Sequence, residues 1–140
     1  MHRIVRFLPT LAQACASVLM LLVVAEEVGA QDCCDPAGPF ALGEDYPKIP
    51  ATCATIGDWA ARAPNTDVRI SLAITGKLSS VKFDGTLALL EMCEAPGVQV
   101  LCVTYSTNSM KVGDTVMLAG GFNKAGEGRI VLDPCLASRE

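Results

Sequence analysis

Histidine is almost missing from this chain: the only one, His2, stands next to the first residue. Histidine is the side chain that most often acts as a general base, a metal ligand or a pH switch near neutrality. Residues 31–140 contain none. That part of the chain therefore excludes the usual serine triad and every zinc site that contains histidine.

Two other motifs with recognised chemistry are missing. No two cysteines have the Cys-x-x-Cys spacing, which argues against a thiol oxidoreductase and against a cysteine-only zinc or copper site. Gly120 and Gly121 end an apolar run without the helix and lysine that a phosphate-binding loop needs. The sequence therefore predicts neither a metal nor a cofactor.

Strong positive charge is absent as well. The formal net charge is −4, and charges of both signs are spread along the chain without a run of either. An acidic surface repels phosphate backbones, so the charge balance predicts that nucleic acid is an unlikely partner.

Carboxylates are the remaining candidates for acid–base chemistry. They are Asp84, Glu91, Glu94, Asp114, Glu127 and Asp133. Most fall in expected turns, and Asp84, Asp114 and Asp133 each adjoin a glycine or proline, where aspartate commonly stabilises a turn. The sequence therefore predicts that the protein is not an enzyme. A small hydrolase that uses Asp84 or Glu91 remains the hypothesis to set against this.

The first thirty residues have the layout of a secretory signal peptide. A basic start with Arg3 and Arg6 precedes an apolar run, and Val28 and Ala30 fit the small-residue positions before a cleavage at Gln31. An uncleaved anchor is the alternative, because residues 7–25 approach the length of a bilayer span. The pattern favours cleavage, and hence a periplasmic or secreted protein with no membrane span after the signal is removed.

Cysteine is plentiful, with seven in the chain. Cys15 lies in the signal, which leaves Cys33, Cys34, Cys53, Cys93, Cys102 and Cys135 as disulfide candidates. An even number in a small exported domain predicts up to three disulfides, and six cysteines allow 15 pairings between which the sequence does not choose. Neighbouring Cys33 and Cys34 would form a strained ring, so we expect each to reach a distant partner and pin the N-terminal arm.

Residues 31–66 predict an irregular arm followed by a short helix. The prolines and acidic residues of 31–50 show no apolar period. Thr52 or Thr55 can cap a helix that ends before Pro64, with Cys53, Ile56 and Ala60 on one face. Trp59 is expected to seal the edge of the core.

Residues 67–140 predict a five-stranded β domain. Residues 67–75 alternate strictly, with Val68, Ile70, Leu72 and Ile74 on one side, and Gly76 predicts a bend in the longer strand. A hairpin follows, closing around Pro96 and Gly97. With a two-residue loop, Cys93 would face residue 100 and Cys102 residue 91, a spacing that permits a disulfide between these cysteines without requiring it.

The last two expected strands are residues 115–122 and 129–132. Asp133 and Pro134 are expected to end the final strand, and Cys135 to tie down the chain end. The domain prediction is therefore a signal peptide (1–30), an arm with a short helix (31–66) and a mainly β barrel (67–140).

The order of elements from Asp67 to Leu136 resembles an OB-fold, a five-stranded Greek-key barrel, and is similar in layout to exported bacterial OB-fold families. The resemblance rests on the long bent first strand, the hairpin, and KVGDTVMLAGGFNKAGEGRIVL from Lys111 to Leu132. The usual helix between the third and fourth strands is reduced to residues 106–111. One end of the barrel would then be open unless the helix near residues 52–63 covers it.

The resemblance implies a ligand face on the second and third strands and the adjoining loops. The implied binding residues are Lys82, Phe83, Gln99, Tyr105, Phe122, Lys124 and Arg129. The aromatic ones could stack on bases or sugars and the cationic ones bind anionic groups, while ordinary core and rim packing is the alternative.

The functional hypothesis is an exported, non-enzymatic binding module whose partner is a protein or an oligosaccharide-type ligand. The alternative is a structural or envelope-stability factor that acts through protein–protein contacts.

Overall fold

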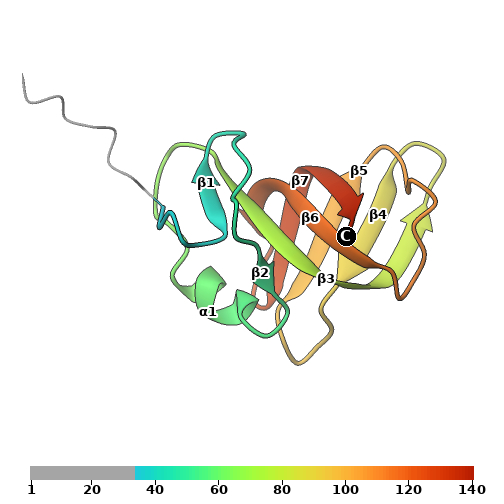
Figure 1. Cartoon of the computed structure of the whole chain (residues 1–140), viewed down its shortest axis with the longest axis horizontal. Coiled ribbons are helices and arrows are strands. Elements are labelled where there is room, and N and C mark those ends of the chain that lie inside the picture. The colour runs from blue at the N-terminus through green and yellow to red at the C-terminus, as the bar shows by residue number, and fades with distance from the viewer. Residues whose placement is uncertain (1–33) are drawn as a thin grey trace, which may run out of the picture.

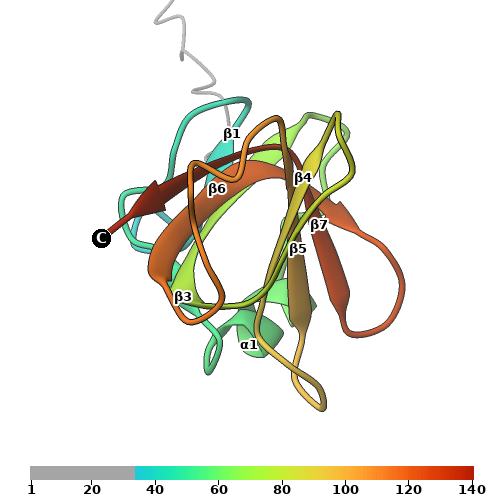
Figure 2. The same ribbon diagram turned by 90° about the vertical axis from the view of Figure 1, so that its right-hand side faces the viewer.

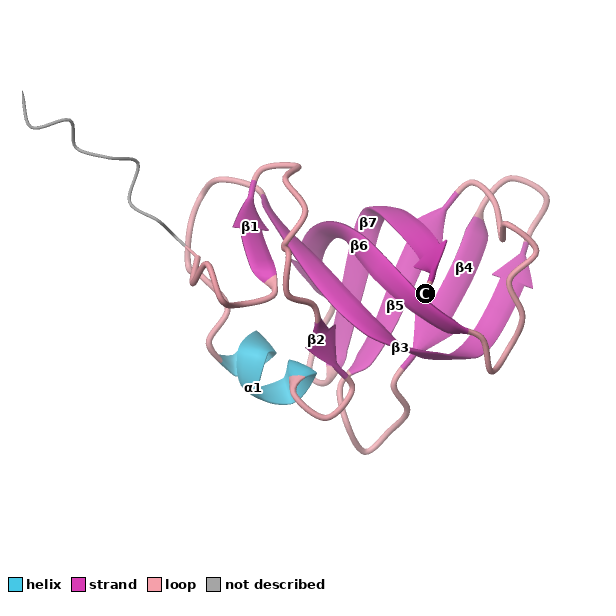
Figure 3. Ribbon diagram, viewed as in Figure 1, coloured by secondary structure: helices cyan, strands magenta, loops and turns pink. Residues whose placement is uncertain are grey.

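A computed structural model describes residues 34–140; the predicted signal peptide and Cys33 lie outside the described residues. In chain order the elements are β1 (Phe40–Leu42), β2 (Ala51–Thr52), α1 (Ile56–Ala61), β3 (Ile70–Phe83), β4 (Ala88–Met92), β5 (Gln99–Thr104), β6 (Thr115–Lys124) and β7 (Arg129–Arg139). Strands dominate this part of the chain, with one short helix beside them (Figure 1, Figure 3). The prediction of a mainly β domain is confirmed.

Five of the strands close into a barrel. The order is β3-β4-β5-β7-β6, and β6 pairs back with β3 to complete the ring. Every neighbour in the ring is antiparallel except β5 and β7, which are parallel. Figure 2 shows the ring, with β1 outside it. This topology is the OB-like Greek-key barrel that the sequence predicts.

Strand β3 serves both sides of the barrel, as predicted from its bend. Its first half pairs with β6, and from Leu78 onward it pairs with β4. Gly76 lies at the change of partner, where an added Cβ would stand 3.2 Å from the sulfur of Cys53. A side chain there would press on that disulfide sulfur, so glycine gives this close contact the space it needs.

The predicted alternation of β3 is wrong on its outer side. Ser71 and Ala73, expected to face solvent, are buried. The N-terminal arm covers them: the Ser71 hydroxyl donates to the carbonyl of Asp45, and the Ala73 N–H donates to the Pro39 carbonyl at 3.0 Å. The strand also begins at Ile70, which leaves Val68 outside it and 58% exposed.

The arm itself is more ordered than predicted, because β1 pairs antiparallel with β3 and β2 pairs parallel with it. Phe40 of β1 packs edge-on against Phe122, with ring centroids 5.1 Å apart. Strands of two and three residues are too short to show a period in the sequence, so only the edge of β3 reveals them.

The hairpin of β4 and β5 differs from its predicted register by one residue. Met92 pairs with Val100 and Leu90 with Cys102. Cys93 leaves the strand with a φ of 63°, which makes the loop longer than two residues. Cys102 therefore points into the barrel rather than toward Cys93.

The cysteines pair accordingly. Cys53 is bonded to Cys93, and Cys102 to Cys135, and Cys34 is disulfide-bonded as well. The predicted disulfide character of these cysteines and the anchoring of the chain end through Cys135 are confirmed. The pairing of Cys33 lies outside the described residues.

The last strand does not end at Asp133 and Pro134 as predicted. Pairing of β7 with β6 shifts between Gly120 and Phe122, so Asp133 and Pro134 bulge out and the strand continues to Arg139. A proline is tolerated there because a residue in a bulge does not have to donate a backbone hydrogen bond to the neighbouring strand.

The two ends of the barrel are covered by different segments. Met110, from the loop between β5 and β6, is buried in the core at the end where a helix is usual. Helix α1 packs at the other end, near Val98 and the turn between β6 and β7. The segment that covers the end in question is therefore the loop with Met110, and not this helix. Within residues 34–140, no helix is long and apolar enough to span a membrane.

Candidate functional site

The outer surface of β4, β5 and β7 carries aliphatic side chains, although residues that face outward do not contribute to the core of the barrel. Inward-pointing residues of these strands are fully buried, and the alternate positions are half-buried on the solvent side. Those outward residues are Leu89, Leu101, Val103 and Val131, which we call the outer apolar row. Leu89 lies opposite Val103 and Leu101 opposite Val131, so the four form one continuous surface.

Polar side chains border the outer apolar row. The Arg129 guanidinium lies 3.4 Å from the Glu91 carboxylate, and Gln99 pairs with Arg129 across the strands. Lys82 stands opposite Leu89 on β3. The ion pair is partly exposed, so it orients these side chains more than it stabilises the fold.

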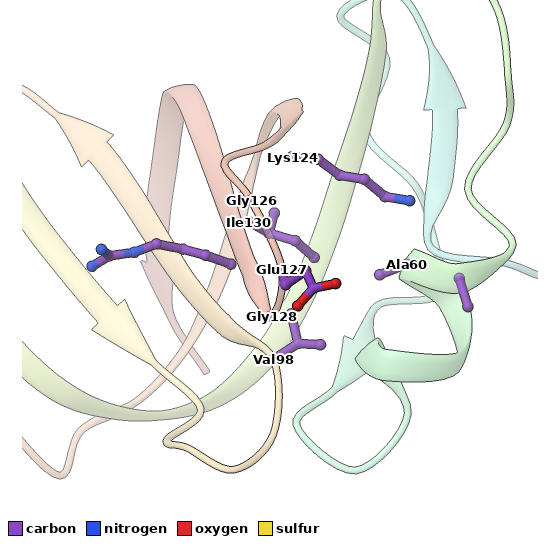
Figure 4. A pocket seen from close by; sticks show the side chains of 9 residues that line it. Ala60, Val98, Lys124, Gly126, Glu127, Gly128 and Ile130 are labelled. Atoms are coloured by element: carbon purple, nitrogen blue, oxygen red, sulfur yellow. The ribbon is translucent and has the colours of Figure 1, made fainter.

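A depression of about 480 Å³ adjoins this face, between α1 and the turn that joins β6 and β7 (Figure 4). It is lined by Ala60, Ala61, Val98, Lys124, Gly126, Glu127, Gly128, Arg129 and Ile130. Lys124 and Glu127 extend from the turn toward the helix. The Arg129 guanidinium is paired with Glu91 instead.

A second depression, of about 660 Å³, lies on the other side of Lys124 along β6. Its rim includes Arg69, whose guanidinium donates to the Asp133 carbonyl at 3.1 Å and lies 3.8 Å from Glu44. Arg69 is thus held across the backbone of Gly121, where an added Cβ would lie 2.7 Å from it.

The structure divides the seven predicted binding residues among three places. Gln99, Arg129 and Lys82 border the outer apolar row, and Lys124 lines both depressions. Phe122 is half-buried against the arm and lines the second depression together with Lys124.

Phe83 and Tyr105 lie at the other end of the barrel, 57% and 78% exposed, away from both depressions. The three aromatic residues therefore do not form a single stacking platform.

The outer apolar row itself escaped the sequence interpretation. A signal for it exists, because Leu89 and Leu90 are adjacent and residues 100–103 are apolar at every position. A strand that faces solvent on one side should alternate, so consecutive apolar residues indicate a second contact face.

Three of the six candidate carboxylates have structural partners. Asp84 caps the turn after β3, Glu91 pairs with Arg129, and Asp114 accepts the Lys111 N–H at 2.9 Å and lies 3.7 Å from Arg139. Among residues 34–140, no three potential metal ligands are grouped together. The absence of catalysis stays a prediction.

We predict an acid-sensitive turn at Asp84. Hydrogen bonds from the N–H groups of Leu87 and Thr86 lower the pKa of its carboxyl below 3.8. Because the folded pKa is the lower one, its contribution is present above pH 3.8 and is lost as the pH falls through the folded value. A carboxyl-detected NMR titration should show this, and Asp84→Asn, whose amide oxygen still accepts, should remove the pH dependence of the turn. A titration midpoint for Asp84 at or above the ordinary value would contradict it.

Comparison with known proteins shows similarity in structure but not in sequence. No protein-family model and no curated protein sequence matches the chain. A chain of the Stn1-Ten1 complex of S. pombe is similar in structure, with a TM-score of 0.37 and 14% identity over 52% of this chain and 60% of that chain. The chain thus spans about three-fifths of its neighbour's length.

One prediction about partners is corrected here: the prediction that nucleic acid is an unlikely partner does not stand, because it rested on net charge alone. Net charge is an average over the whole surface and does not describe any one face, which is why it was insufficient for that exclusion.

Proposed function

We propose that the protein is a non-enzymatic OB-fold binding module that holds a partner on the outer face of β4, β5 and β7. The outer apolar row supports this most directly. The barrel interior is filled by its own residues, so the fold gains little from leucine and valine on the opposite face. Contiguous apolar surface bordered by polar groups is typical of interaction sites.

The chemistry of this face favours a protein partner, one of the two kinds of partner in the sequence-based hypothesis. Bases and sugars are usually held by stacking on aromatic rings, and the four residues of the row are aliphatic. Leu101 and Val131 instead suit the apolar side chains of a protein, with the Glu91–Arg129 pair at the rim providing orientation.

The site of action that we propose is the periplasm or the extracellular space. The signal-like first thirty residues motivate this proposal, and the disulfides Cys53–Cys93 and Cys102–Cys135 are compatible with an oxidising compartment. Peptide mass mapping of chain recovered outside the cytoplasm should begin at Gln31. Recovery of the intact first thirty residues in the membrane fraction would contradict it.

The partner surface can be tested by photo-crosslinking in cells that export the chain. A crosslinking amino acid at position 101 or 103 should give the same adduct, and one at Ser138, an exposed residue of β7 outside the outer apolar row, should give none. Leu101→Lys should weaken the adduct formed from position 103 by about tenfold or more, since it buries an unpaired charge at the contact.

The same Leu101→Lys variant should keep its stability within about 0.5–1 kcal/mol, because the residue is already partly solvated. Adducts of equal yield from positions 101 and 138, or none from 101 and 103, would overturn the proposal.

A further inference from the structure

The depression beside α1 is built from three segments that are distant in sequence. Helix α1 contributes Ala60 and Ala61, the loop before β5 contributes Val98, and the turn between β6 and β7 contributes the opposite wall. Figure 4 shows these segments facing one another across the depression. Since α1 is not one of the five barrel strands, this site exists only because the N-terminal segment packs here.

The floor of the depression is apolar and its rim carries one charge of each sign. Ala60, Val98 and buried Ile130 supply the apolar surface. Lys124 and Glu127 both extend into the space, and neither forms an ion pair within residues 34–140. The Arg129 guanidinium is directed to Glu91 instead.

A disulfide joins two walls of the depression. Cys53 lies three residues before α1, and its partner Cys93 begins the loop that leads to Val98. Gly57 of α1 approaches Val98 closely, since an added Cβ there would lie 3.9 Å from the valine side chain. The bond therefore limits how far the helix can move from the barrel.

We propose that this depression binds a free α-amino acid with an apolar side chain. Lys124 would pair with the carboxylate of the ligand, Glu127 with its ammonium group, and the floor would take the side chain. A volume of about 480 Å³ is within the range of small-molecule sites, about 300–1,000 Å³, and is ample for such a ligand.

The pair of charges distinguishes this ligand from related ones. The carboxylate of a fatty acid would pair with Lys124. Glu127 would then face either the hydrocarbon chain of the fatty acid or its carboxylate, and neither pairs with a negative charge. A phosphate would be repelled by Glu127 and would lack the arginine fork, because Arg129 is already paired. Only a zwitterion matches both side chains at once.

The test is a titration of the folded chain with leucine, followed by amide NMR. Signals of Val98, Gly126 and Gly128 should shift in a saturable way. N-acetylleucine lacks the ammonium group and leucinamide lacks the carboxylate, so each should bind about two- to fivefold more weakly, as expected for loss of an exposed charge pair. Absence of saturable shifts with leucine, or equal binding of all three compounds, would overturn the proposal.

Variants separate the two charges. Lys124→Met should abolish the preference for leucine over leucinamide, and Glu127→Gln the preference for leucine over N-acetylleucine. Lys111→Met, which changes a lysine outside the lining of the depression, is the matched control and should leave affinity unchanged. Loss of affinity in the control equal to that in Lys124→Met would count against the site.

Removing the disulfide between Cys53 and Cys93 tests whether holding α1 against the barrel is needed for binding. The double variant Cys53→Ala, Cys93→Ala should keep the barrel spectrum through Cys102–Cys135 and yet bind leucine several-fold more weakly, because α1 is freed. Unchanged affinity in a folded double variant would show that the Cys53–Cys93 disulfide does not contribute to the site.

Discussion

Replacing Gly120 with alanine is expected to destabilise the barrel severely. A Cβ at this position would lie 2.2 Å from the Pro134 carbonyl oxygen and 2.9 Å from the Cα of Cys135. Both are backbone atoms, so no side-chain rotation relieves the clash, and β6 and β7 would have to separate. We expect a loss of about 4 kcal/mol or more, within the range of severe core defects and comparable to the whole stability of a marginal domain.

Gly57→Ala is the control for this substitution. Gly57 lies in α1, and an added Cβ there meets only Val98, at 3.9 Å. Alanine loses less backbone freedom than glycine in a helix, so this variant should be more stable by about 0.5–1 kcal/mol. Urea unfolding of both variants decides the matter, and a Gly120→Ala protein with an unchanged midpoint would refute the close approach of the two strands.

The same two strands show what could be predicted from the sequence and what could not. A glycine pair within an apolar strand indicates a close backbone approach, because glycine has few other uses there. The continuation of β7 past Pro134 could not be predicted, since it depends on a bulge. That bulge forms only when Gly120 and Gly121 of β6 lie alongside.

The register of the β4–β5 hairpin has a similar explanation. Turn residues predicted the hairpin itself, but the register depends on where the chain leaves β4. Cys93 leaves at a positive φ, which local sequence does not indicate for cysteine. The shift of one residue places Cys102 opposite Leu90 instead of Glu91, with its side chain in the core and bonded to Cys135.

For the candidate site, the sequence identified charged residues better than surfaces. Lys124 and Arg129 do border the two candidate surfaces. The outer apolar row was missed because apolar residues in strands were assigned to the core. The wall formed by α1 was missed because packing between the helix and a distant turn leaves no local pattern.

Removal of the Cys53–Cys93 or the Cys102–Cys135 disulfide is the second change with a large expected effect on stability. In the chain-entropy account their contributions should be nearly equal, because the bonded cysteines are 33 and 40 residues apart, and each loop corresponds to about 4 kcal/mol. Their surroundings differ, however. Cys102 and Cys135 are both buried in the core, whereas in the other pair Cys93 is buried and Cys53 is exposed.

Alanine in place of Cys102 and Cys135 should therefore cost more than alanine in place of Cys53 and Cys93. The buried pair adds a cavity where two sulfur atoms stood, which we estimate at about 1–2 kcal/mol beyond the loop entropy. It also releases the parallel contact between β5 and β7 that closes the ring. Denaturant unfolding of the two double variants tests this ranking, with peptide mapping to verify that the other disulfide has formed. Equal losses of unfolding free energy would mean that loop closure alone accounts for the contribution of both disulfides. A larger loss for Cys53–Cys93 would mean that the packing of α1, rather than the contact between β5 and β7, limits the stability of the fold.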